Sequence, residues 1–337
     1  MSTTSTGDRS TRSDGDYTVS IILPVYNDSD TIERSLKSLL EQSYQNLEII
    51  VVNDGSTDDT ASRAREITKY DSRAKVVDIP HSGTSAAKNS GFSLSKGPVV
   101  LFAEGDALYE KDYVASAVRC LKEDPEIGGV CVLGGIWEVR RTFVTRSIEA
   151  ENKVIHSLIH RGVLKPYYAW VFTRAALTRV GLYDVRLKQA EDRDLFNRVR
   201  SAGFRIGLVE GVHWRHRRFE TTPQFFAKTV RKGERRIEFI VKDGRTSDFA
   251  KGVGLLWSLI VLVSLSLVVP EFAWTVLGWV VFFVAIFYWR LARRAQGANL
   301  SEAQFLELPI YQMLRYLANA IGYTLGILKY PFRNRSD

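Results

Sequence analysis

The 337-residue sequence has little cysteine and lacks the common glycine-rich phosphate loops. Its two cysteines, Cys120 and Cys131, form no CxxC pair and no cluster with histidine, so we expect neither disulfides nor a zinc site, and a reducing compartment. The absence of GxxxxGK[ST] and GxGxxG disfavours an ATPase or a dinucleotide dehydrogenase. Residues 1–16 contain no apolar run, which predicts a disordered, solvated tail and no signal peptide.

Basic residues outnumber acidic ones, and the formal net charge is +8. Such a chain attracts nucleotide diphosphates, lipid phosphates, an anionic bilayer or nucleic acid, and charge alone does not choose among them. The basic excess lies beside long apolar segments, and no aromatic-rich basic module is present. Nucleic acid is therefore not an expected partner.

Two uncharged apolar runs, 252–269 and 272–289, predict a membrane anchor. As a helix, each run of about 18 residues spans roughly 27 Å, close to the thickness of a hydrocarbon core. Lys and Arg flank the pair on both outer sides while the connecting turn has none, so we expect both ends in the cytoplasm at the cell membrane. Helical apolar spacing from 308 to 330 predicts an amphipathic helix in the membrane plane, with a third crossing as the competing interpretation.

Before these runs, short β-branched segments alternate with helical patterns, which predicts an α/β domain with a mostly parallel sheet and helices on both faces. The predicted strands are 19–25, 47–52, 75–79 and 98–102. The expected organisation is a disordered tail at 1–16, the α/β domain at 17–240 and a basic linker at 241–251. Two transmembrane helices at 252–289 and a basic loop with an interfacial helix at 290–337 follow.

Polar clusters follow the strands, where ligands bind in sheets of this kind. They occupy residues 53–59 after the second strand, 104–106 after the fourth, and 191–194 further along. Together with Ile21-Ile22-Leu23-Pro24-Val25-Tyr26-Asn27 and Ala86-Ala87-Lys88-Asn89-Ser90-Gly91, these segments resemble, in the correct order, glycosyltransferase family 2 with its GT-A (nucleotide-diphospho-sugar transferase) fold. The resemblance covers residues 18 to 216.

The resemblance implies a binding site for a nucleotide-diphosphate sugar donor. Asp54 falls where the family binds the base or ribose, and a carboxylate there can accept from either; capping of the next helix is the competing role. Pro24, Tyr26 and Asn27 correspond to the lip around the base, where Tyr26 can stack. Lys88 stands where the family commonly has Arg and could offset pyrophosphate charge, with a solvated surface lysine as the other interpretation.

Glu104-Gly105-Asp106 matches the DxD position, whose acidic oxygens hold Mn²⁺ or Mg²⁺ against the donor pyrophosphate. The first acid is Glu104 here, which leaves its role open between ribose and a bound water, and Asp106 is the expected direct ligand. The family often places a histidine near the metal or the diphosphate. His216 is the candidate and His213 the rival.

Asp192, with its neighbour Glu191, corresponds to the family's catalytic base, which takes the proton of the acceptor hydroxyl and inverts the anomeric configuration. The following segment is helical, so its positive end favours an ionised base; the competing view is that these acids only begin the helix.

The implied activity is transfer of a single hexose or hexuronic acid to a polyprenyl or dolichyl phosphate or a lipid-linked oligosaccharide, as in N-glycosylation or cell-surface glycan assembly. A weak or silent membrane scaffold of GT-A shape is the alternative.

Overall fold

The computed structural model describes residues 17–137, 142–166, 168–187, 189–217, 221–237, 240, 257–258, 260–261, 263–269 and 271–333. The strands are β1 Val19–Val25, β2 Leu47–Asp54, β3 Ala74–Ile79, β4 Val99–Phe102, β5 Ala107–Tyr109, β6 Ile127–Trp137, β7 Val171–Thr173 and β8 Arg205–Arg217. The helices are α1 Ile32–Leu40, α2 Thr60–Thr68, α3 Thr84–Leu94, α4 Tyr113–Glu123, α5 Phe143–His160, α6 Arg174–Val180, α7 Glu191–Ser201, α8 Thr222–Arg235, α11 Phe272–Arg294 and α12 Glu302–Arg333.

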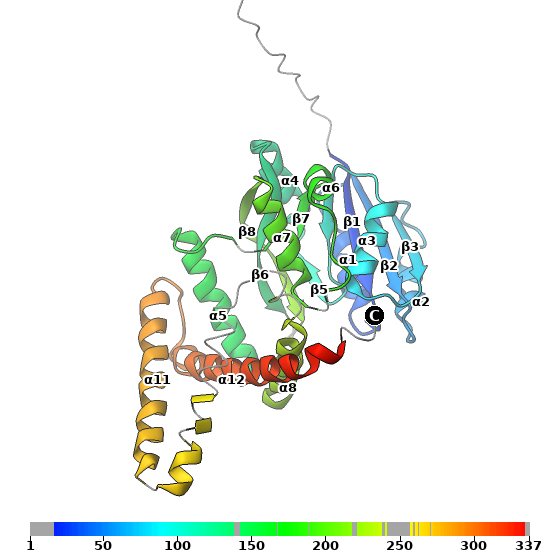
Figure 1. Cartoon of the computed structure of the whole chain (residues 1–337). Helices are drawn as coiled ribbons and strands as arrows, with labels where there is room; N and C mark the ends of the chain where they lie inside the picture. The colour runs from blue at the N-terminus through cyan, green and yellow to red at the C-terminus, as the bar shows by residue number, and fades with distance from the viewer. Residues whose placement is uncertain are drawn as a thin grey trace, which may run out of the picture.

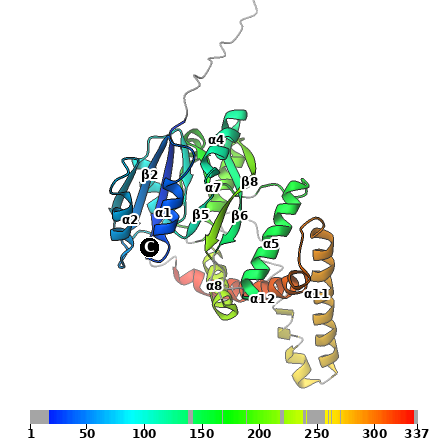
Figure 2. The ribbon, with the colours of Figure 1, turned by 180° about the vertical axis from the view of Figure 1, so that it is seen from behind.

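These strands form an eight-stranded sheet in the order β3-β2-β1-β4-β7-β6-β8-β5 (Figures 1 and 2). The strands β3, β2, β1 and β4 are parallel, β7 is antiparallel to both neighbours, and β6 pairs with β8 in parallel. The four predicted strands correspond to β1, β2, β3 and β4, and the predicted α/β architecture is confirmed. The mixed half from β7 onward was not anticipated.

Both faces of the central strands are buried, which explains their nearly continuous apolar sequence. Along β1, Ile21 and Leu23 point into the core beneath α1 and α4, whereas Ile22 points into the core beneath α3, α6 and α7. Helix α3 lies close to β1 at Gly91, where an added Cβ would be 2.4 Å from Ile22 Cγ2. Because the parallel strands end at one edge, the polar segments after β1, β2 and β4 meet there.

The C-terminal helix α12 belongs to the body of the protein rather than lying apart from it. Leu308 and Tyr311 of α12 are buried in a cluster with Val144 of α5, Phe225 of α8 and Leu291 of α11. Further along, Gly322 lies against Gly233 of α8. Figure 1 shows α12 running across the lower end of the domain, nearly perpendicular to α11. The sequence had predicted an interfacial helix here, and its packing on α8 and α5 is added by the structure.

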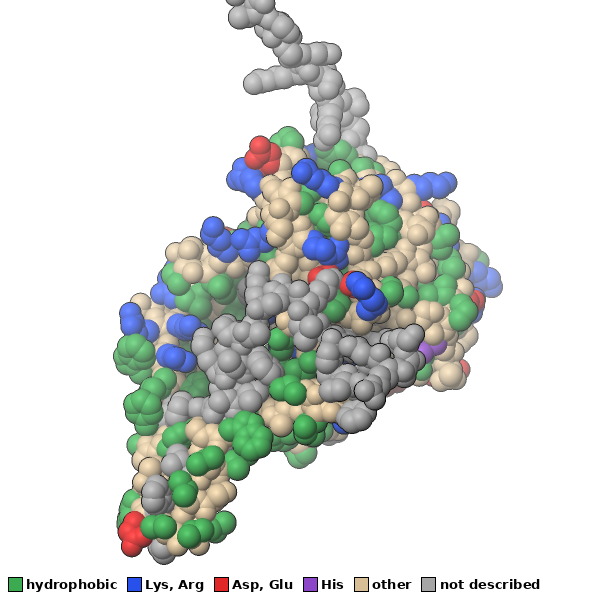
Figure 3. Space-filling view, in the orientation of Figure 1, with side chains coloured by type: hydrophobic (Ala, Val, Ile, Leu, Met, Phe, Trp, Pro, Cys, Tyr) green, Lys and Arg blue, Asp and Glu red, His purple; other side chains and the backbone are tan. Residues whose placement is uncertain are grey.

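Of the predicted membrane segments, the second run lies within α11, where residues 273–294 form the single helix of the described part that is long and apolar enough to cross a membrane. Most of its surface is exposed, including Trp274 and Phe282. On the face shown in Figure 3, hydrophobic side chains gather on the protruding lower part, and Lys and Arg side chains lie above it. The first run falls partly outside the described residues. The tail 1–16 and the linker 241–251 fall wholly outside them. The hairpin therefore stays a prediction.

Candidate active site

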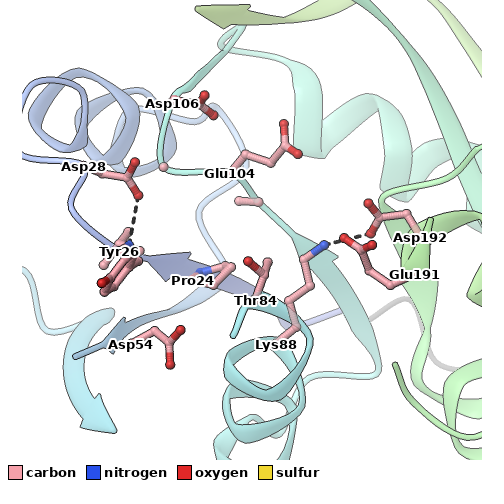
Figure 4. Close-up of a pocket in the computed structure, with 13 residues that line it drawn as sticks. Pro24, Tyr26, Asp28, Asp54, Thr84, Lys88, Glu104, Asp106, Glu191 and Asp192 are labelled. Carbon is pink, nitrogen blue, oxygen red and sulfur yellow. Dashed lines mark hydrogen bonds and ion pairs between the residues drawn. The ribbon is translucent and has the colours of Figure 1, made fainter. Parts of the chain in front are cut away.

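A cavity of about 370 Å³ opens where the parallel strands end (Figure 4). It is lined by Pro24, Val25, Tyr26, Asp28, Asp54, Thr84, Lys88, Ala103, Glu104, Gly105, Asp106, Glu191 and Asp192. The chain thus brings residues from the ends of β1, β2 and β4 together with the first turns of α3 and α7. The sequence predicted most of these residues, but not Asp28 and Thr84.

At one end of the cavity, Asp54 is held by the loop that leads into α3. Its Oδ1 accepts from the backbone N–H of Ser82 at 2.7 Å and its Oδ2 from that of Gly83 at 2.9 Å. The ring of His81 lies beside the same carboxylate, with Nδ1 3.0 Å from Oδ2. Tyr26 stacks on His81 with ring centroids 4.1 Å apart and stays 43% exposed, so its outer face is open to an aromatic ligand.

Asn27 does not line the cavity and instead ties two loops together. Its backbone is left-handed, with φ of 54°. The side-chain Oδ1 of Asn27 accepts from the backbone N–H of Thr57 at 2.9 Å, and the backbone N–H of Asn27 donates to Ser56 Oγ at 3.1 Å. The loop after β1 is thereby fixed to the loop after β2. We assign Asn27 to shaping the lip rather than to direct ligand contact.

Glu104, Asp106 and His216 converge at the other side of the cavity. His216 Nε2 lies 3.2 Å from Asp106 Oδ1 and 3.4 Å from Glu104 Oε2, and the three potential ligand atoms are all within 4.8 Å of one another. The convergence arises because β5, directly after Asp106, pairs with β8 and sets Ala107 opposite His216. His213 lies elsewhere, with Nδ1 3.3 Å from the carbonyl oxygen of Leu133.

The chemistry of this triad fits a hard divalent cation. Two carboxylates and one imidazole are suitable ligands. Glu104 Oε2 is buried and accepts no hydrogen bond from the described residues, although His216 Nε2 lies 3.4 Å away. Burial raises the pKa of Glu104; the charge of His216 opposes this effect, and that of Asp106 adds to it. A bound cation would compensate the two crowded carboxylates. The longer side chain of Glu104 therefore does not remove it from the cluster.

Asp28 adds a further carboxylate that the sequence analysis missed. Its Oδ2 accepts from the backbone N–H of Tyr26 at 3.1 Å. Burial raises the pKa of Asp28 to about 6, against that hydrogen bond and with the help of the charge of Asp106. A Cβ added at Gly105 would be 2.8 Å from Asp28 Oδ2, so the DxD-like turn approaches it closely through glycine. The signal available was its position directly after Tyr26-Asn27.

The predicted base lies in the first turn of α7, whose start is set by the left-handed residue Ala190 (φ 67°). Asp192 Oδ1 accepts from Lys88 Nζ at 2.8 Å. Burial raises the pKa of its neighbour Glu191, and the charge of Asp192 adds to that effect. The sequence left Lys88 between a role at the donor pyrophosphate and a solvated surface position. The side chain is buried, which rules out the solvated position, and its ammonium pairs with Asp192.

Comparisons with known proteins agree with this geometry. Residues 20–176 match the profile described as glycosyl transferase family 2, and residues 167–334 match that of glycosyl transferase family 21. The chain is 34% identical over 189 residues to the uncharacterized glycosyltransferase EpsJ of Bacillus subtilis, covering 52% of this chain and 53% of EpsJ. It is 27% identical over 204 residues to glycosyltransferase AglE of Haloferax volcanii, covering 58% of this chain and 65% of AglE.

Among solved structures, mannosyltransferase PcManGT from Pyrobaculum calidifontis in complex with GDP-Man and Mn²⁺ superposes with a TM-score of 0.55. The two proteins are 19% identical, and the alignment covers 94% of this chain and 87% of PcManGT. The fold is thus GT-A-like. Residues 20–176, a little under half of the chain, resemble the glycosyl transferase family 2 domain. The chain spans about half the length of EpsJ.

Proposed function

We propose that this protein is an inverting, metal-dependent glycosyltransferase. It moves one hexose or hexuronic acid from a nucleotide-diphosphate sugar to a polyprenyl or dolichyl phosphate, or to a lipid-linked oligosaccharide, at the cytoplasmic face of the cell membrane. The observation that carries the proposal is a single cavity lined by Glu104 and Asp106, which form a triad with His216 behind them, and by the Asp192 carboxylate. A silent scaffold has no need of this arrangement.

The donor is proposed to lie along the cavity, with its base against Tyr26 and Asp54 and its diphosphate toward Asp106. The cation that the triad would hold, Mn²⁺ or Mg²⁺, supplies Lewis-acid stabilisation of the leaving diphosphate when bound. Without it, six carboxylates among the described lining residues would repel the donor phosphates, since Lys88 is the single cation among them.

The acceptor hydroxyl is proposed to approach from the side of Asp192. On a sugar hydroxyl of a lipid-linked oligosaccharide, the carboxylate takes the proton while the hydroxyl oxygen forms a bond to the anomeric carbon. A polyprenyl or dolichyl phosphate attacks through an oxygen that is already ionised, so no proton passes to Asp192 in that case. The bond from that carbon to the diphosphate oxygen breaks, and the nucleotide diphosphate leaves with the bonding electrons. Attack opposite the leaving group inverts the anomeric configuration.

Membrane attachment is supported by α11 and α8. The exposed apolar side chains of α11 end at Trp289 and the arginines Arg290, Arg293 and Arg294, a pattern typical of the membrane interface. Helix α8 carries Lys232, whose charge acts on Glu191, while the neighbouring Gly233 faces α12. A basic helix between the active site and the apolar segments is a suitable place for a lipid phosphate.

The test uses the full-length protein in nanodiscs with polyprenyl phosphate and, separately, with a lipid-linked oligosaccharide. The lipid-linked oligosaccharide, which carries sugar hydroxyls, is the acceptor in every assay of Asp192 and Lys88. Because the fold neighbour binds GDP-Man, GDP-mannose is the first donor tried, followed by UDP-hexoses and UDP-hexuronic acids. We expect metal-stimulated transfer that EDTA abolishes and that falls at least about 10²-fold in Asp106→Ala, because the diphosphate loses its metal bridge. Glu126→Gln, at an exposed carboxylate on the opposite edge of the sheet, is the matched control. Undiminished turnover in EDTA would contradict the metal assignment, and failure to bind any nucleotide sugar would refute the function.

A further inference from the structure

Lys88 occupies an unusual position for a donor-binding lysine. Its side chain is 3% exposed, and Nζ lies 2.8 Å from Asp192 Oδ1 (Figure 4). The ammonium also lies 4.5 Å from the ring centroid of Tyr183 and 5.2 Å from that of Trp170. Two aromatic rings and a carboxylate therefore surround the charge. Turning it toward another anion would break a charge-assisted hydrogen bond in a buried site, which is costly.

The backbone around this contact is also fixed. Asn89, next to Lys88, donates from Nδ2 to the carbonyl oxygen of Tyr183 at 2.9 Å and accepts from its N–H at 3.0 Å. This pair of bonds clamps α3 to the segment that leads into α7. Burial, followed by the charge of Asp192, raises the pKa of Tyr183 well above its ordinary value, so its hydroxyl stays neutral and hydrogen-bonds to Asp192.

We propose that Lys88 is a positioning residue for the base. It fixes the Asp192 carboxylate so that a lone pair of a carboxylate oxygen, not used by Lys88, faces the incoming hydroxyl. A carboxylate has about four lone-pair sites, and two donors leave some of them for the substrate. This inference rests on the proposed glycosyl transfer, and it replaces the pyrophosphate role that the sequence suggested for Lys88.

The charge balance of the step is consistent with this role. When Asp192 takes the acceptor proton, Lys88 loses its anionic partner. Burial alone would lower the pKa of Lys88, but the charges of Asp192, Glu191 and Glu104 raise it above the ordinary value. Glu191 and Glu104 are further acidic neighbours of Lys88, and the proton transfer to Asp192 does not remove them.

The experiment compares Lys88→Met, Asp192→Asn and the double variant with the wild type, all as full-length protein in nanodiscs. Lys96→Met, at an exposed lysine just beyond α3, is the matched control. We measure kcat and, without acceptor, the dissociation constant of the donor with Mn²⁺. We expect Lys88→Met to lower kcat at least about 10-fold with donor affinity within about 3-fold, and the double variant to be no slower than Asp192→Asn, because residues acting as one unit are not additive.

A weakening of donor binding by about 10-fold or more with kcat retained would overturn the inference in favour of a diphosphate ligand. Losses that multiply in the double variant would equally refute it, since they would mean independent roles. Lys88→Gln, which keeps a hydrogen-bond donor, replaces Lys88→Met if that variant does not fold. Because donor affinity is read without acceptor, the role of Lys88 stays measurable even where the wild type transfers no sugar, an outcome that would count against the proposed function instead.

Discussion

Substituting Gly322 by alanine tests how α12 is attached to the catalytic domain. A Cβ at this position would lie 2.2 Å from the carbonyl oxygen of Val230 and 3.0 Å from the Cα of Gly233, both backbone atoms of α8. Neither atom can turn aside as a flexible side chain could, so the two helices must separate. Forcing one methyl group into such a contact costs roughly 1–3 kcal/mol.

Part of that cost is offset because alanine favours a helix over glycine by about 1 kcal/mol. We therefore expect Gly322→Ala to lose up to roughly 2 kcal/mol of folding free energy, a fall in Tm of up to a few degrees measured by thermal unfolding in detergent. Gly278→Ala in α11 is the matched control, because no atom of the described residues lies within 4 Å of the added Cβ and the propensity gain remains. Equal Tm values for the two variants would refute the close packing of α12 on α8.

The remaining predictions concern the site. Asp192→Asn should lower kcat by roughly 10²-fold or more with donor affinity unchanged, because a base acts in the transition state; steady-state kinetics in which Glu191→Gln is equally damaging would leave the base ambiguous. For Asp28, the folded pKa of about 6 exceeds the ordinary value of 3.8, so the folded state binds the proton more tightly and stability falls as pH rises between the two values. Without metal at pH 7.5, Asp28→Asn should therefore have a higher Tm than the wild type, with an unfolding free energy larger by up to about 3 kcal/mol. At pH 3 the two proteins should have the same Tm, and the reverse pH order would contradict this assignment.

The strand and motif predictions succeeded where the signal was local. Strand β1 begins and ends where its apolar run predicts, at Val19 and Val25. Asp54, Glu104 and Asp192 were expected from polar clusters in the sequence and from the family resemblance, and all three line one cavity at the end of the parallel strands. Asp28 was missed because its raised pKa comes from burial and from charges of other segments, which no local pattern reveals.

Other assignments depended on which segments meet in space. The sequence left His216 and His213 as rivals, and the pairing of β5 with β8 brings His216 to Asp106 while His213 contacts Leu133. Likewise, nothing near Lys88 in the sequence indicates a partner 104 residues away at Asp192. A lysine that reads as a donor ligand becomes a neighbour of the base only once α3 and α7 are packed together.

The sequence by itself determined the α/β class, the positions of the acidic clusters and the apolar character of residues 272–289, because propensity, periodicity and composition act over a few residues. Tertiary structure alone decided which histidine joins Glu104 and Asp106, which carboxylate holds Lys88, and that α12 packs on α8 through Gly322. These are long-range contacts, and their geometry is set by strand pairing and by close packing of backbones rather than by any local preference of the chain.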